Sequence, residues 1–176
     1  MPTIISHPAV PVAMSIALGS RLISGRLLLA GVAASVLPDL DVVAFRLGIG
    51  YAHDFGHRGA SHSVLFALAV AALSLLAARK LQAAPWLAFL FVFLAGVSHP
   101  LLDMCTSGGL GAALWWPVSH ERLFFPTQVI EVSPLSLRRF LGPAGASVIV
   151  SEVLWVWLPC SAIALASLVL RRKNAP

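Results

Sequence analysis

The chain has 176 residues, of which 59% are hydrophobic and only 11% are charged. Its mean hydropathy of +0.89 exceeds what a soluble core requires and predicts one membrane-embedded domain, residues 1–176, because the length allows only one compact unit. The formal net charge of +5 comes from positive residues scattered at segment ends, so we expect no nucleic-acid partner.

Five apolar segments follow one another along the chain. Residues 8–20 and 27–37 are short and resemble a hairpin of two short or re-entrant helices. Residues 63–78 are marginal for a membrane span, residues 84–102 form an uninterrupted one, and residues 146–170 are longer and contain Glu152 and Pro159. Because a bilayer requires backbone hydrogen bonds to close within each segment, we predict an all-α polytopic membrane bundle. About four to five helices are expected to be membrane-embedded, with residues 146–171 as a C-terminal anchor.

The basic residues predict an orientation. With Arg79 and Lys80 in the cytoplasm, alternation of the segments places seven basic residues inside against five outside, namely Arg46, Arg58, Arg122, Arg138 and Arg139. Independently of orientation, alternation brings residue 7, the loop 38–62 and the segment end 99–103 to the same face of the membrane. The positive-inside choice makes that face periplasmic or extracellular.

Histidines and aspartates gather at this face, where ionisable groups of a membrane protein usually mark a functional site. His99 and Asp103 are four residues apart, so on a helix they share a face and could bind one cation. They could equally cap the helix or hydrogen-bond to each other. Asp39 and Asp41 follow an apolar run, and the metal-ligand interpretation is nearly balanced by that of a helix stop and a new N-cap. If they are ligands, one is expected to bind and the other to support.

Residues 53–63, H-D-F-G-H-R-G-A-S-H-S, form the densest polar segment. Its imidazoles and carboxylate suit zinc, manganese or iron better than magnesium, although loop histidines are often merely solvated. The guanidinium of Arg58 matches a phosphate group, with an ion pair to Asp54 or a lipid contact as the alternatives. Ser61 is predicted to cap the following helix.

The order of His7, P-D-L-D at 38–41, H-R-G-A-S-H-S at 57–63 and S-H-P-L-L-D at 98–103 resembles the YdjM family of predicted inner-membrane metal-dependent hydrolases. The resemblance covers roughly the first 130 residues. That family is distantly similar to the zinc-dependent phospholipase C and nuclease superfamily, and this similarity implies a metal shell of His7, Asp39, His57, His62, His99 and Asp103. Asp41 is a further candidate from the P-D-L-D motif itself. The superfamily's histidine after the H-x-x-x-D aspartate is missing here, which favours one or two ions over three.

Together these features predict a hydrolase of the bacterial inner membrane. A divalent ion, zinc before manganese or iron, would activate water against a phosphoester. His53 or Asp54 is the candidate general base and Arg58 the phosphate-binding residue, with Arg122 as a weaker second candidate. A lipid or another amphiphilic phosphoester is the expected substrate, because aromatic residues at 115–116 and 124–125 belong at a membrane interface. The alternative is a non-catalytic metal-binding membrane protein, either a carrier or a scaffold.

Overall fold

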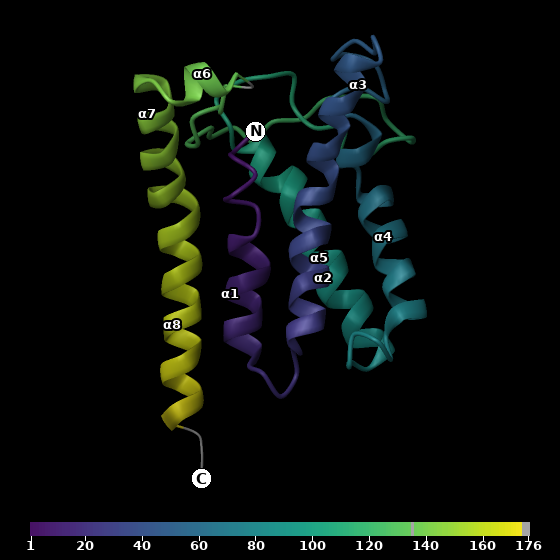
Figure 1. Cartoon of the computed structure of the whole chain (residues 1–176), viewed down its shortest axis with the longest axis vertical. Coiled ribbons are helices and arrows are strands. Elements are labelled where there is room, and N and C mark those ends of the chain that lie inside the picture. Colours follow the sequence, from purple (N-terminus) through teal and green to yellow (C-terminus); the bar gives the residue numbers. More distant parts are fainter. Residues whose placement is uncertain (135, 174–176) are drawn as a thin grey trace.

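The computed structural model describes residues 1–134 and 136–173, and the named elements in these ranges are all helical (Figure 1). The all-α prediction is confirmed. In chain order the elements are α1 (Ala9–Leu18), α2 (Gly25–Val36), η1 (Leu37–Val42), α3 (Val43–Arg46), η2 (Ala60–His62), α4 (Val64–Ala77), α5 (Pro85–Met104), α6 (Leu137–Phe140), α7 (Pro143–Glu152), the π-helical turn η3 (Val153–Trp157) and α8 (Leu158–Lys173).

Three helical stretches are long and apolar enough to cross a membrane: Gly25–Arg46, Pro85–Met104 and Pro143–Lys173. The first combines α2, η1 and α3, and the last combines α7, η3 and α8, so it begins earlier than the predicted segment 146–170. The helices α1 and α4 are apolar but shorter. A total of four to five membrane-embedded helices therefore stays a prediction.

Serine side chains begin two of the helices. Ser24 accepts a hydrogen bond from the backbone N–H of Leu27, and Ser63 accepts one from that of Phe66, as N-caps of α2 and α4. The prediction that Ser61 is the cap of α4 was wrong. A 3₁₀ turn over residues 60–62 moves the helix start to Ser63 and leaves Ser61 free to contact Asp41 instead.

Helix α5 lies at the centre of the bundle and packs against α2 and α4, while α1 packs against α8. Small residues allow the close approach. A Cβ atom at Gly31 would lie 2.4 Å from the ring of Phe91, which is 1% exposed, so a larger side chain there would push α2 away from α5. The largest apolar cluster, which includes Leu27, Ala71 and Phe91, packs α2, α4 and α5 together.

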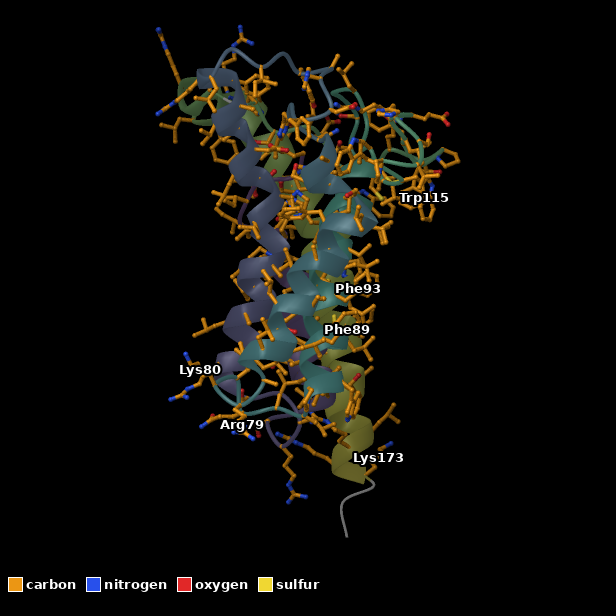
Figure 2. All side chains as sticks on the ribbon, turned by 90° about the vertical axis from the view of Figure 1, so that its right-hand side faces the viewer. Arg79, Lys80, Phe89, Phe93, Trp115 and Lys173 are labelled. Carbon is orange, nitrogen blue, oxygen red and sulfur yellow. The ribbon has the colours of Figure 1, made fainter. Side chains whose placement is uncertain are left out.

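The two ends of the bundle differ in character. Figure 2 shows Arg79, Lys80 and Lys173 at one end and Trp115 at the other. The start of the chain, α3, and the final turn of α5 lie at the end opposite the lysines (Figure 1). Residues that are far apart in sequence, before α1, after α2, before α4 and late in α5, therefore meet at one end of the molecule.

Candidate metal centre

Three helical elements and the segment before α1 carry the predicted ligands to this end. Asp39 lies in η1, which continues α2, and His62 ends η2 just before α4. His99 and Asp103 lie in the last turns of α5, and His7 precedes α1. These side chains are almost fully buried, between 0% and 3% exposed.

Imidazole nitrogens and carboxylate oxygens converge at the centre of this group. One ligand atom from each of Asp39, His62, His99 and Asp103 lies within 4.8 Å of the others. The Nε2 atoms of His62 and His99 are 3.0 Å apart, and His62 Nε2 is 3.1 Å from Asp103 Oδ2. Asp39 Oδ1 lies 3.5 Å from His99 Nε2.

His7 completes one side of the cluster. Its Nε2 lies 3.7 Å from Asp39 Oδ2 and 3.9 Å from Asp103 Oδ1. Its ring stacks on that of His99, with the centroids 3.7 Å apart. The structure thus brings five of the predicted ligands together.

Hydrogen bonds on the far side of two imidazoles orient their lone pairs. His99 Nδ1 lies 2.7 Å from the carbonyl oxygen of Ser35. Because a carbonyl oxygen can only accept, this nitrogen carries the proton and donates the hydrogen bond. His62 Nδ1 lies 3.2 Å from a carboxylate oxygen of Asp41. With both Nδ1 atoms protonated, the two Nε2 atoms face each other as acceptors, an arrangement that needs a proton or a metal ion between them.

Several buried polar atoms have no hydrogen-bond partner among the described residues. They include both ring nitrogens of His7 and all four carboxylate oxygens of Asp39 and Asp103. Unsatisfied buried acceptors are costly, and a bound cation would satisfy them. Mixed imidazole and carboxylate donors fit zinc, manganese or iron.

Formal charge points the same way. Within the site, the three carboxylates of Asp39, Asp41 and Asp103 face one guanidinium, that of Arg58, which leaves two negative charges in excess when the histidines are neutral. One divalent cation would balance this excess. Burying unbalanced charge costs several kcal/mol, so the count favours one divalent ion in this site.

Asp41 supports the neighbouring side chains. Its carboxylate lies 2.6 Å from His57 Nδ1, accepts a 2.6 Å hydrogen bond from the hydroxyl of Ser61, and accepts the backbone N–H of Arg58 at 3.1 Å. Asp41, His57 and His62 form a second group with metal-ligand spacing. In the described contacts, however, Asp41 serves to hold two imidazoles by their Nδ1 atoms.

Arg58 is fully buried and adopts a left-handed φ of 62°. Its Nε lies 3.2 Å from Asp103 Oδ2, its NH2 group donates to Thr106 Oγ1 at 2.9 Å, and its NH1 group donates to the carbonyl oxygen of Gly108 at 3.0 Å. The ion pair that Arg58 makes is thus with Asp103 and not with Asp54. The guanidinium fixes one carboxylate of the cluster in place.

His53 and Asp54 lie on the exposed loop before η2, and the structure does not bring them into the cluster. Asp54 pairs instead with His120, at 2.9 Å, and this hydrogen bond lowers the pKa of Asp54. A lowered pKa makes this carboxylate a weaker general base. Sequence reasoning passed over His120, which stands alone in its segment and reaches Asp54 only through the loop fold.

Arg122 also has a local role. Its guanidinium donates to the carbonyl oxygens of Tyr51, His53 and His57, so it holds the loop before η2 in shape. Backbone carbonyls carry no side-chain signal, and this contact could not be read from the sequence. Gly59 allows the same loop to close, because a Cβ atom there would lie 2.0 Å from the carbonyl oxygen of Asp54.

The electrostatics of His62 reflect its two carboxylate neighbours. Burial lowers the pKa of His62, but its two carboxylate neighbours, Asp103 and Asp41, outweigh this effect and raise it to about 9. A proton on Nε2 then occupies the position that a cation would take. Metal binding at this site is therefore coupled to loss of that proton.

Two apolar cavities flank the centre. One, of about 350 Å³, is lined by Ile4, Ile5, Val42, Pro134 and Phe140 and reaches Asp39. The other, of about 410 Å³, is lined by Leu65, Phe66 and Trp116 and reaches Asp41 and Ser61. Of these two cavities, only the first is lined by a carboxylate of the four-residue group Asp39, His62, His99 and Asp103.

Comparison with known proteins agrees with the resemblance seen in the motifs. Residues 1–175 match the family described as YdjM inner membrane protein, which extends the resemblance past residue 130. The chain is also 46% identical, over 160 residues, to a protein named inner membrane protein YbcI from Escherichia coli (strain K12). The match spans 90% of this chain and 92% of that protein. No solved structure shows significant similarity to the chain.

Proposed function

The chain belongs to the YdjM family of inner membrane proteins, and from this premise we propose that it is a metal-dependent hydrolase of amphiphilic phosphoesters. One observation carries the proposal: buried acceptor atoms of His62, His99, Asp39 and Asp103 converge within 4.8 Å. Buried acceptors of this kind are costly without a partner, and a bound cation satisfies them.

The ligands would be His62, His99, Asp39 and Asp103, with His7 beside them. A divalent cation held there supplies water activation and stabilises negative charge on a phosphoryl oxygen. Asp41 and the carbonyl oxygen of Ser35 keep the imidazoles in the tautomer that binds a cation. Zinc is the metal that we expect first, because imidazole and carboxylate ligands suit it. One ion is expected, because the site holds two excess negative charges.

The cavity beside Asp39 supports an amphiphilic substrate. Its walls, formed by Ile4, Ile5, Val42 and Phe140, suit a hydrocarbon chain, and Asp39 of the cluster is among its lining residues. The adjoining hollow shares Pro134 with this cavity and is lined by Arg138 and Arg139, which favour an anionic molecule. A phosphoester with an apolar tail fits this combination.

We propose that the protein crosses the inner membrane several times and that its site lies on the periplasmic face. Arg79, Lys80 and Lys173 lie together at the far end of the bundle (Figure 2). Arg26 donates to the carbonyl oxygen of Lys80, and Arg171 donates to that of Ile16 near the end of α1, which places two more cations at that end. Positive charge favours the cytoplasm.

The test uses protein purified in detergent, stripped with a chelator and reloaded with Zn²⁺ or Mn²⁺. We expect about one ion per chain by elemental analysis, with hydrolysis of a chromogenic phosphodiester or of a phospholipid only after reloading. His99→Ala should lose both the ion and the activity. His120→Ala is the matched control, because His120 is 64% exposed and contacts Asp54 instead of the cluster.

The outcomes separate the candidate functions. Metal binding without turnover across soluble and lipid phosphoesters would favour the carrier or scaffold. If the parent protein binds neither Zn²⁺ nor Mn²⁺ after reloading, there is no metal site and the proposed function is wrong.

A further inference from the structure

Glu152 is a carboxylate that the metal centre does not use. It lies within the long apolar helix Pro143–Lys173, and its residue is only 3% exposed. A charge in such a place needs donors, and the described chain supplies three. The backbone N–H of Thr3 donates to one carboxylate oxygen, and the hydroxyls of Thr3 and Ser6 donate to the other at 2.6 Å each.

The π-helical turn adds a second contact to the same segment. Trp157 donates its Nε1–H to the hydroxyl oxygen of Ser6 at 3.0 Å. In a regular α-helix, residues 152 and 157 would point about 140° apart, because each residue advances the helix by about 100°. The turn over Val153–Trp157 is hydrogen-bonded from i to i+5, which brings Glu152 and Trp157 to the same side.

The residue that receives these contacts, Ser6, directly precedes His7 of the cluster. Ser6 is fully buried and precedes His7, whose two ring nitrogens have no hydrogen-bond partner in the described chain. The described contacts of the His7 ring are its approach to the two carboxylates and its stacking on His99. Its position therefore depends on the backbone that carries it, and Glu152 and Trp157 hold that backbone.

We infer that Glu152 is a positioning residue for the metal centre: through Thr3 and Ser6 it holds His7 in place as a ligand. The inference rests on the proposed metal site and gives the last helix a role beyond that of a membrane anchor. Residues 3–7 are too short to form a helix of their own. Local hydrogen bonds, from the Ser6 N–H to the Thr3 carbonyl oxygen and from the Ala9 N–H to the Ser6 carbonyl oxygen, shape this segment. Glu152, almost 150 residues away in the sequence, fixes it to the helical stretch Pro143–Lys173.

The test is a double-mutant cycle on Zn²⁺ affinity, measured in detergent by competition with a chelator. Glu152→Ala should weaken Zn²⁺ binding by about 10- to 100-fold, the usual effect of removing a group that orients a ligand. The same substitution in a His7→Ala background should change the affinity no further. A role only in general stability would give additive effects instead.

Milder variants keep the test valid if Glu152→Ala does not fold. Glu152→Gln keeps an acceptor for the Thr3 N–H and should retain most of the affinity, and Trp157→Phe removes only the donor to Ser6 and should weaken binding less than Glu152→Ala. Ser151→Ala is the matched control, because this neighbouring buried hydroxyl accepts from the N–H of Glu131 and not from the N-terminal segment. Its Zn²⁺ affinity should equal that of the parent.

Two results would overturn the inference. In the first, Glu152→Gln and Trp157→Phe fold and bind Zn²⁺ as the parent does, and Glu152→Ala loses no more affinity than Ser151→Ala. In the second, the losses of affinity from Glu152→Ala and His7→Ala simply add. Either result means that Glu152 does not act through His7. A parent protein that binds no Zn²⁺ removes the proposed function and this inference together, so the two failures are distinguishable.

Discussion

His62 and His99 face each other through their Nε2 atoms, which lie 3.0 Å apart with no donor between them when both Nδ1 atoms carry protons. Two imidazole lone pairs at this distance repel each other. Either a proton or a cation must lie between them, and the nearby carboxylate of Asp103 favours both. The competition between proton and cation has a measurable consequence.

The first prediction is that metal affinity rises with pH. The pKa of His62 is raised to about 9 by its carboxylate neighbours, so the metal-free site holds a proton at neutral pH. Each bound Zn²⁺ then displaces about one proton, and the apparent Kd falls about tenfold per pH unit between about pH 6 and 8. Calorimetry in buffers with different ionisation enthalpies measures the released proton. A Kd that stays constant over this range would contradict the assignment.

The ligand types and their meeting at one face could be predicted from the sequence. Alternating segments place His7, the loop before α4 and the end of α5 on one side, and H-x-x-x-D spacing places His99 and Asp103 on one helical face. Histidines and aspartates gathered at the ends of apolar segments already indicated a functional site.

The division of roles could not be predicted in the same way. Asp39 and Asp41 lie two residues apart in one short motif, and the 3₁₀ turn decides that Asp39 joins the cluster while Asp41 holds His57 and His62. Local patterns say little about Glu152, because its donors come from Thr3 and Ser6 at the other end of the chain. Long-range contacts of this kind have no local signal.

A second prediction concerns the sidedness of the protein. In a background with Cys105 and Cys160 replaced, a cysteine in place of Asp54 should react with an impermeant thiol reagent in intact cells, because this loop lies at the end of the bundle that carries the site. A cysteine in place of Lys80 should react only after the membrane is permeabilised. The reverse labelling pattern would put the site in the cytoplasm.

A third prediction tests the cavity beside Asp39. Val42→Trp should narrow this cavity and raise the KM for a long-chain phosphoester in mixed micelles at least about tenfold, the effect of excluding one or two methylene groups. Hydrolysis of a small soluble phosphodiester and the metal content should be unchanged. Leu76→Trp is the control for adding a tryptophan, because Leu76 on α4 is 87% exposed. Equal effects on both substrates would show that the cavity does not hold the apolar tail.

The last prediction separates two roles for Arg58. Its buried guanidinium already has partners in Asp103, Thr106 and Gly108, so we expect it to stabilise the site more than to bind substrate. Arg58→Met leaves the carboxylate of Asp103 without this partner and should cost about 3–5 kcal/mol of stability in the metal-free protein. The loss should be smaller with Zn²⁺ bound, because the cation then neutralises the carboxylate.

Arg58→Lys distinguishes the two roles most sharply. A lysine keeps the charge but cannot reach all three partners in the fixed geometry of a guanidinium, so thermal unfolding should occur several degrees lower than in the parent. Arg46→Lys is the control, since Arg46 is an exposed arginine of α3 at the same end of the bundle. If Arg58→Lys unfolds at the parent temperature, keeps its metal and still loses most of its turnover, Arg58 binds the phosphate of the substrate.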